Sequence, residues 1–285
     1  MMAAPSQSPN PAAAQLHPVL RDLFAHPLPV VMGVLNVTPD SFSDGGRFAE
    51  PALALAQAKR MIAEGAGILD VGAESTRPYG SKPVSGEEEL QRLRDILPTV
   101  AALETLVSID TMKASVAAWA LRNGATIAND VWGLQRDPDM ARVIADQNAP
   151  VIVMHNRESV DPAIDIMTDM AAFFTRTLDI AAKANIPQGN IVLDPGIGFG
   201  KTPEQSMTAL ARLDELSQFG LPLLVGASRK RFISTVTPSE PHQRIGGSIA
   251  AHLLAAQRGA KIIRAHDVAE TVQALRVASA IEDKR

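Results

Sequence analysis

The chain has 285 residues, of which 46% are hydrophobic and 20% are charged, and its formal net charge is -4 at pH 7. Such a chain can form one large domain or two smaller ones, and it lacks the strongly basic balance typical of nucleic-acid binding. It has no cysteine, which excludes disulfides, thiolate zinc sites and iron–sulfur clusters.

Residues 1–28 are rich in Ala, Pro, Ser and Gln, and this composition predicts a flexible N-terminal tail. The chain shows neither the charged and apolar regions of a secretion signal nor a run of about 20 apolar residues. We therefore expect a cytoplasmic protein without membrane contact. Residues 29–285 remain as one domain, close to the length of about 250 residues that a barrel of eight β/α units needs.

Residues 29–285 alternate between short apolar runs and Ala-rich stretches. Runs of Val, Ile and Leu are typical of buried parallel strands, and the Ala-rich stretches predict helices. Several of these stretches end at a glycine, namely Gly65, Gly124 or Gly259, as helix C-caps do. The expected strands are Val30–Leu35, Gly67–Val71, Leu106–Ile109, Ala125–Ala128, Pro150–Met154, Asn190–Leu193, Pro222–Val225 and Lys261–Ile263, and the clearest helices are Leu53–Glu64, Lys113–Asn123, Met167–Ala184 and Ile245–Arg258.

Eight such units favour an α/β fold with a closed parallel (β/α)8 TIM barrel over an open doubly wound sheet, which has roughly five to seven strands. A two-domain Rossmann protein would need a second shift in composition, and the chain shows none. Two connections, residues 37–50 and 73–86, are long and rich in Gly, Pro, Ser and Asp. We expect these loops, which follow the first and second strands, to act as lids or binding loops.

Polar side chains follow each apolar run. The carboxyl ends of barrel strands converge on one face, where active sites of this fold lie. Capping of the following helix explains Asp110 about equally well. It does not explain Arg264 and His266, because cations are unfavourable at a helix N-terminus. The polar strand-end residues are Asn36, Glu74, Thr76, Arg77, Asp110, Asn129, Asp130, His155, Asp194, Ser228, Arg229, Lys230, Arg264 and His266.

The charges of these side chains suggest the ligand. Acceptors suited to a flat, N–H-rich heterocycle stand at Asp110, Asn129 and Asp194. Donors suited to phosphate oxygens stand at Arg77, Lys230, Arg264 and His266. The amide of Asn36 can hold Mg²⁺, a cation that otherwise keeps water and substrate phosphates. We therefore expect a heterocycle that carries a phosphate or diphosphate.

Two other patterns carry less weight. The glycine-rich segment Gly196–Thr202 resembles a phosphate-binding P-loop, but Pro195 stands where the first glycine is required and the spacing is one residue short. We expect its glycines to let the backbone approach a ligand closely. The run Glu87–Glu89 predicts a solvated first turn of a helix.

Seven sequence motifs lie at or near the strand ends and follow one another in a characteristic order. They are residues 33–46 (GVLNVTPDSFSDGG), 70–78 (DVGAESTRP), 108–111 (SIDT), 129–131 (NDV), 193–201 (LDPGIGFGK), 226–230 (GASRK) and 264–268 (RAHDV). Together they closely resemble the dihydropteroate synthase family of pterin-binding barrels, over residues 30 to about 280. Residues 130–134 and 154–158 depart from the loops common in that family.

The resemblance implies a transferase of folate biosynthesis, in which 6-hydroxymethyl-7,8-dihydropterin diphosphate condenses with 4-aminobenzoate to give 7,8-dihydropteroate and diphosphate. It also implies a homodimer formed through outer helices, and sulfonamides as 4-aminobenzoate mimics. The implied pterin residues are Asp110, Asn129, Val131, Met154, Asp194 and Lys230. The implied diphosphate residues are Asn36, Arg77, Arg264 and His266, with Mg²⁺ at Asn36. The implied aminobenzoate residues are Phe42, Thr76, Pro78, Phe199 and Ser228. Gly226 is implied in substrate binding, and the implied catalytic residues are Asp110, Lys230, Arg264 and His266.

Two alternatives share this fold. Pterin-dependent methyltransferases keep residues such as Asn129 and Asp194 but have no need of diphosphate and aminobenzoate groups. A non-catalytic pterin-binding paralogue is expected to lose Asn36, Arg77 or Lys230, and this chain keeps all three. Both observations favour the synthase.

Overall fold

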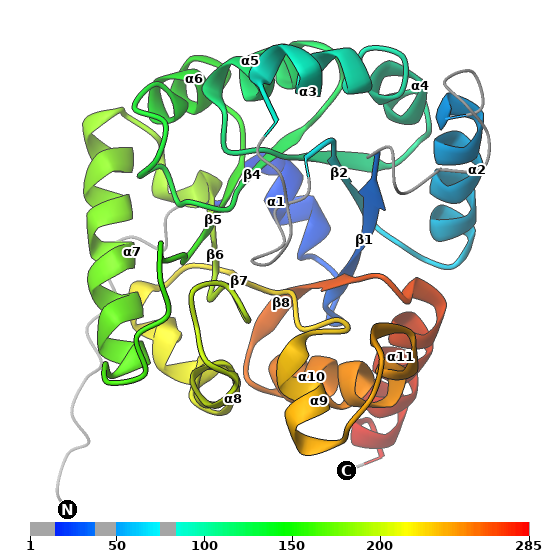
Figure 1. Ribbon diagram of the computed structural model, residues 1–285. Helices are drawn as coiled ribbons and strands as arrows, with labels where there is room; N and C mark the ends of the chain where they lie inside the picture. The colour runs from blue at the N-terminus through cyan, green and yellow to red at the C-terminus, as the bar shows by residue number, and fades with distance from the viewer. Residues whose placement is uncertain (1–14, 38–49, 75–83, 285) are drawn as a thin grey trace, which may run out of the picture.

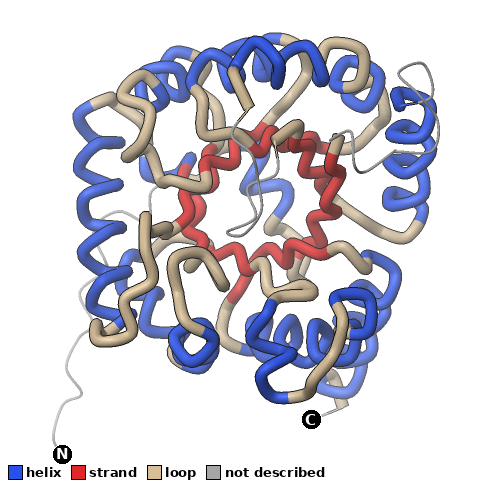
Figure 2. Tube along the Cα trace, viewed as in Figure 1, coloured by secondary structure: helices blue, strands red, loops and turns tan. Residues whose placement is uncertain are grey.

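The protein is a closed barrel of eight parallel strands surrounded by helices (Figures 1 and 2). The computed structural model describes residues 15–37, 50–74 and 84–284. Each strand pairs with the next one in the chain, and the first pairs with the last. The predicted TIM barrel is confirmed. The strands are β1 Val30–Asn36, β2 Ile68–Gly72, β3 Leu106–Asp110, β4 Ile127–Asp130, β5 Val151–Met154, β6 Ile191–Asp194, β7 Leu223–Val225 and β8 Ala260–Ala265.

Several strands continue one or two residues beyond the apolar runs. Asn36, Asp110 and Asp194 are the last residues of their strands. Strand pairing uses the backbone N–H and C=O groups, so a polar side chain does not prevent a residue from pairing with the next strand. Asp110, for example, is in register with Asn129 of β4. The sheet itself therefore holds these three side chains, whereas Ser228, Lys230 and His266 follow the ends of their strands.

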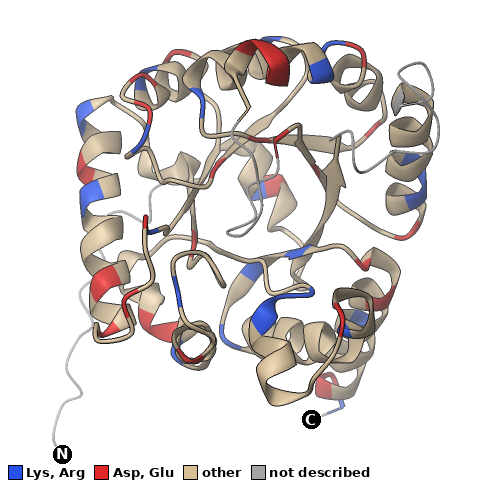
Figure 3. Cartoon of the chain, viewed as in Figure 1, with Lys and Arg blue, Asp and Glu red and all other residues tan. Residues whose placement is uncertain are grey.

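The helices cover the outside of the barrel, and acidic and basic positions are interspersed over them (Figure 3). Gly65, Gly124 and Gly259 have φ values of 101°, 108° and 94°, so each predicted helix end is closed by a residue without a side-chain clash. No helix in the described ranges is long and apolar enough to span a bilayer. The helices are α1 Pro18–Leu23, α2 Glu50–Ala63, α3 Gly86–Leu93, α4 Leu97–Ala101, α5 Ala114–Arg122, α6 Met140–Asp146, α7 Ile166–Lys183, α8 Pro203–Ala211, α9 Arg231–Val236, α10 Ile245–Gln257 and α11 Val268–Glu282, with 3₁₀ turns η2 Gln188–Asn190, η3 Leu213–Phe219 and η4 Pro241–Gln243.

Alternating strand residues form two separate cores. One set packs outward against the helices, as Val107 and Ile109 of β3 do. The other set fills the lower barrel interior as a closed apolar layer. Its fully buried members are Leu20, Met32, Ile68, Ile127, Ile152, Val192, Leu224 and Ile262.

Helix α1 closes the amino-terminal end of the barrel. Leu20 is fully buried within the interior apolar layer, and the His17 amide donates a hydrogen bond to the Gly189 carbonyl. The helix lies upstream of the predicted start of the domain at residue 29. These tertiary contacts stabilise the short apolar face of α1. The composition of residues 1–28 does not reveal such contacts, so it did not predict the helix.

We expect Leu20→Ala to lower the free energy of unfolding by about 2–4 kcal/mol, because it leaves a cavity within the interior apolar layer. Chemical denaturation followed by circular dichroism measures the change. Arg21→Ala is the control, since the Arg21 side chain next to it is exposed. Equal effects of the two substitutions would show that α1 does not contribute to the core.

Candidate active site

Inward-facing side chains near the carboxyl ends of the strands form a buried charged cluster. The Arg264 Nε on β8 donates to Asp70 Oδ2 at 2.6 Å, and its Nη2 donates to Asp110 Oδ2 at 2.9 Å. The Asn129 amide donates to the same Asp70 carboxylate at 3.2 Å. The structure thus brings together three of the predicted residues, from β3, β4 and β8.

Asp70 of β2 belongs to this cluster and was not among the predicted site residues. It is fully buried and lies two residues after Ile68 of the interior apolar layer. The alternation of strand side chains was the available signal, because it places residues 68 and 70 on the same side of the sheet.

Asp110 combines a raised pKa with an open acceptor. Burial raises the pKa of its carboxyl well above the ordinary value, the neighbouring Asp70 adds to the shift, and Arg264 opposes it. Its Oδ1 atom is buried and has no hydrogen-bond partner within the described residues. A buried polar atom of this kind calls for a partner, and a bound heterocycle with N–H groups would supply one.

Asp194 ends β6 and holds the glycine-rich turn that follows. Its Oδ1 accepts the Gly196 amide at 2.8 Å. Burial raises the pKa of Asp194 to about 6, while the Gly196 hydrogen bond and the charges of Lys230 and Arg264 oppose the shift. The Lys230 ammonium lies 4.1 Å from the centre of the Phe199 ring. The predicted site residues Asp194, Phe199 and Lys230 therefore lie together at one side of the barrel mouth.

His266 is half-buried and lies close to three cationic side chains. Burial and then the charges of Arg264, Arg229 and Lys230 lower its pKa to about 3. The Ser228 hydroxyl accepts the His266 amide at 3.2 Å and lies 3.1 Å from the ring Nδ1. We assign the Ser228 hydroxyl as the donor and Nδ1 as the acceptor of this hydrogen bond, so the ring proton of the neutral imidazole lies on Nε2. Ser228 thus pairs with a predicted diphosphate residue.

The other predicted residues occupy strand ends or lie outside the described ranges. Asn36 is half-buried at the end of β1, and Val131 and Met154 are buried beyond β4 and at the end of β5. A side chain at Gly226 would contact Arg264 at 3.6 Å. Phe42, Thr76, Arg77 and Pro78 lie outside the described residues.

His155 points away from the barrel interior, in contrast to the neighbouring Met154. It packs against Phe173, with ring centres 4.9 Å apart. Its Nε2 lies 3.0 Å from Asp169 and its Nδ1 lies 2.6 Å from the Lys201 ammonium. Lys201 also donates to the Gly196 and Phe199 carbonyls. This group supports the turn after β6 from behind.

A second buried ion cluster flanks the connection between residues 74 and 84. The Lys113 ammonium contacts Glu74 and Glu89 at 2.5 and 2.7 Å, and Glu74 also accepts the Val84 amide. Glu89 is fully buried, so the prediction of a solvated turn at Glu87–Glu89 is wrong at its last residue. Burial raises the pKa of Glu89, and Lys113 opposes the shift.

Lys113→Met is expected to reduce the free energy of unfolding by about 3–5 kcal/mol, because it leaves two buried carboxylates without their cation. Thermal or urea denaturation at pH 8 measures the loss. Lys183→Met, at an exposed position near the end of α7, should leave stability almost unchanged. A loss no greater than that of the control would contradict the role of Lys113.

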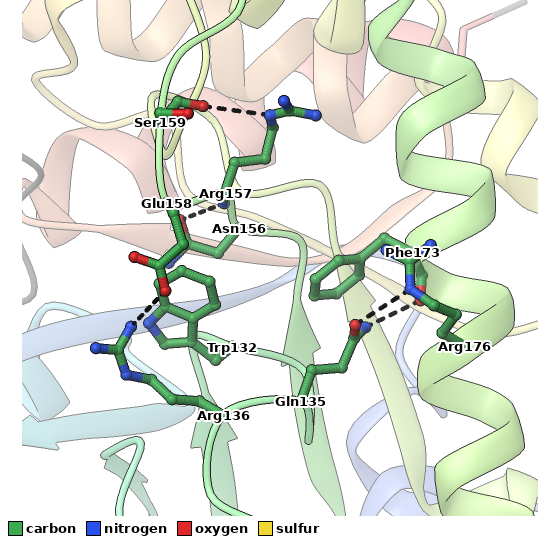
Figure 4. A pocket seen from close by; sticks show the side chains of 9 residues that line it. All are labelled: Trp132, Gln135, Arg136, Asn156, Arg157, Glu158, Ser159, Phe173 and Arg176. Carbon is green, nitrogen blue, oxygen red and sulfur yellow. Dashed lines mark hydrogen bonds and ion pairs between the residues drawn. The ribbon is translucent and has the colours of Figure 1, made fainter.

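The two loops that depart from the family pattern, together with Phe173 and Arg176 of α7, line a separate hollow of about 510 Å³ (Figure 4). Asp130 shapes the first loop by accepting the Trp132 and Leu134 amides. The Arg136 guanidinium lies 4.7 Å from the centre of the Trp132 ring and pairs with Glu158 of the second loop. Asp130 therefore caps the turn that follows β4 and does not cap a helix.

The described residues contain no group of three or more His, Cys, Asp or Glu side chains arranged for a metal ion. Asn36 offers a single amide oxygen at the barrel mouth. One protein oxygen fits Mg²⁺ that takes its remaining ligands from phosphate and water. Asn36 therefore fits a Mg²⁺ ion that binds together with a substrate phosphate.

Comparison with known proteins agrees with this geometry. Residues 32–266 match the family model described as pterin binding enzyme. The dihydropteroate synthase of Bacillus subtilis is 43% identical over 256 residues, which cover 90% of this chain and 89% of the relative.

Two solved structures superpose closely on the barrel. Clostridium difficile dihydropteroate synthase, solved in the presence of pteroic acid, has a TM-score of 0.86 at 45% identity and covers 89% of this chain and 97% of its own. Xanthomonas albilineans dihydropteroate synthase with 4-aminobenzoic acid has a TM-score of 0.86 at 43% identity, covering 90% and 93%. The chain therefore belongs to the dihydropteroate synthase family of pterin-binding enzymes.

Proposed function

We propose that the charged cluster around Arg264 is the active centre of a dihydropteroate synthase. The reaction condenses 6-hydroxymethyl-7,8-dihydropterin diphosphate with 4-aminobenzoate and releases diphosphate. The main support for this proposal is the half-buried guanidinium of Arg264, which donates to both Asp70 and Asp110, with Asn129 in the same network. It combines an anion-binding donor with acceptors for a heterocycle.

The pterin ring binds to the acidic side of this cluster. Asp110, Asn129 and Asp194 accept its N–H groups, and Lys230 donates to its oxygen and ring nitrogen. Val131 and Met154 pack against its faces. The unpartnered Oδ1 of Asp110 supports this assignment, as does burial of all three acceptors.

The diphosphate binds to the basic side, where Arg264 and His266 donate hydrogen bonds and Arg77 adds a further cation. The N–H groups on Nη1 of Arg264 make no hydrogen bond to the described residues, so they can donate to an anion. When bound, Mg²⁺ at Asn36 would neutralise charge on the diphosphate. Gly226 lies beside Arg264 and contributes to the same substrate-binding site.

4-Aminobenzoate occupies the outer part of the mouth, against Phe42, Thr76, Pro78, Phe199 and Ser228. Sulfonamides, which mimic this substrate, would compete for the same position. The two long connections, residues 37–50 and 73–86, close over the bound substrates and complete this pocket. If Thr76→Ala and Pro78→Ala leave the affinity for 4-aminobenzoate unchanged, the second connection does not form the pocket.

The C–O bond to diphosphate breaks before the new C–N bond forms, because an aniline nitrogen is a weak nucleophile. Arg264 and His266 stabilise the charge that builds on the leaving diphosphate. Positive charge spreading into the pterin lowers the pKa of the nearby Asp110, which favours its carboxylate form at this step. A secondary deuterium isotope effect above unity is expected at the pterin methylene, and a value of unity would contradict this order.

The direct test incubates purified protein with both substrates and identifies dihydropteroate by mass. Product is expected with added Mg²⁺ and should fall sharply when a chelator removes the cation. Full activity in chelator would overturn the metal proposal alone. Absence of product under every condition would overturn the function.

We also propose that the chain is a cytoplasmic homodimer that associates through outer helices. A groove of about 390 Å³ on α8, α9 and α10 is lined mainly by apolar side chains, and Val236 and Leu254 on it are 69% and 46% exposed. A second copy of this chain would cover that surface. Sedimentation velocity should give a dimer for the wild type and a monomer for Leu254→Glu. Val277→Glu on α11, outside the groove, should remain dimeric, and a monomeric wild type would overturn the proposal.

A further inference from the structure

Asp70 is a buried carboxylate on β2 to which the proposed reaction gives no role. Both of its oxygens face functional groups: Oδ2 accepts Arg264 Nε at 2.6 Å and Asn129 Nδ2 at 3.2 Å, and Oδ1 lies 3.3 Å from the same amide nitrogen. The side chain is 0% exposed, so water does not compete for these contacts. One carboxylate therefore joins the diphosphate side and the pterin side of the site.

The contact with Nε fixes the guanidinium of Arg264. A guanidinium is planar, and its plane is set once two of its nitrogens are held. Asp70 holds Nε while Asp110 holds Nη2. The N–H groups on Nη1 are then presented to an anion in one orientation, without the rotamer freedom of an unrestrained side chain.

The contact with Asn129 fixes the direction of its amide. An asparagine side chain can present either its oxygen or its NH₂ group after a half-turn. A carboxylate only accepts hydrogen bonds, so the NH₂ group must face Asp70 and the oxygen must face away. This orientation makes Asn129 an acceptor for the N–H groups of a pterin.

We propose that Asp70 is a positioning residue that sets the orientation of both Arg264 and Asn129 for substrate binding. The inference rests on the proposed function for the identity of the ligand. Without the Asp70 charge, Asn129 can turn its NH₂ group toward the pterin, where two donors would meet. Pterin affinity therefore depends on a residue that does not touch the pterin.

Asp70→Asn tests the proposal in the full-length protein, with calorimetric titration of 6-hydroxymethyl-7,8-dihydropterin that lacks diphosphate. We expect the pterin affinity to fall by at least about tenfold, the size of a lost hydrogen bond to a charged partner. Ser108→Ala is the matched control, because Ser108 is in register with Asp70 on the adjacent strand and is equally buried. Its affinity for pterin should not change.

A double-mutant cycle separates positioning from a general effect on the fold. If Asp70 acts through Asn129, Asp70→Asn should cost less than about threefold in an Asn129→Ala background, because coupled residues are not additive. An equal cost in both backgrounds would overturn the proposal, and so would unchanged affinity in the single variant. Wild-type protein that binds no pterin would overturn the proposed function instead.

A double variant that exchanges the two side chains tests the proposal even if Asp70→Asn alone does not fold. Asp70→Asn combined with Asn129→Asp retains one carboxylate and one amide within hydrogen-bond distance. The proposal predicts that this pair binds pterin more tightly than Asn129→Asp alone. Equal or weaker binding by the pair would contradict it.

Discussion

Arg264→Lys is expected to lower kcat/KM by about 10³, equivalent to about 4 kcal/mol of transition-state stabilisation. Lysine offers one compact charge, whereas Arg264 donates from separate nitrogens to Asp70 and Asp110 and keeps others for an anion. A lysine ammonium cannot reproduce all of these contacts at once. Steady-state kinetics with both substrates measures the loss.

The surface offers a matched control for this substitution. Arg142 also lies between two carboxylates, Asp139 and Asp146, but these three side chains are more than 60% exposed. Arg142→Lys should leave kcat/KM unchanged, because exposed ion pairs contribute little. Wild-type kcat/KM in Arg264→Lys would contradict the proposal that the Arg264 guanidinium stabilises the transition state.

Asp194→Asn is expected to stabilise the fold while lowering kcat/KM by about 10². Burial raises the folded-state pKa of Asp194 from 3.8 to about 6. The ionised carboxylate therefore costs stability as the pH rises from about 4 to 6, and the full cost remains at higher pH. Asparagine does not ionise, and its oxygen can still accept the Gly196 amide. The variant should thus gain roughly 1–3 kcal/mol at pH 8 and almost nothing at pH 4.

Urea denaturation at these two pH values measures the gain, and Asp130→Asn supplies the contrast. Burial also raises the pKa of Asp130 to about 6, but its two oxygens accept the amides of Trp132 and Leu134. An asparagine has one acceptor oxygen, so this variant should lose stability at pH 4, where no ionisation cost is relieved. A gain for Asp194→Asn that is the same at pH 4 and pH 8 would contradict the electrostatic origin.

The barrel and much of the site could be predicted because both follow from local patterns. Buried parallel strands are continuous apolar runs, and the polar residue that ends each run marks the barrel mouth. This reasoning identified Asp110, Asn129, Asp194 and Arg264, which the structure places in one cluster or close to it. Their roles toward the substrates stay predictions.

Other features depended on contacts between distant segments. His155 was grouped with the strand-end residues, but its position alternates with Met154 and faces Asp169 and Lys201. Glu89 is buried because Lys113, 24 residues away, supplies its cation. A run of three glutamates contains no sign of that partner.

The measurement that tests the account most directly is release of diphosphate by the purified chain from 6-hydroxymethyl-7,8-dihydropterin diphosphate. Release should depend on added 4-aminobenzoate, yield dihydropteroate in equal amount, and fall by about 10³ in Arg264→Lys. Release that is absent from folded protein, or that proceeds equally without 4-aminobenzoate, would contradict the assignment of this barrel as a dihydropteroate synthase.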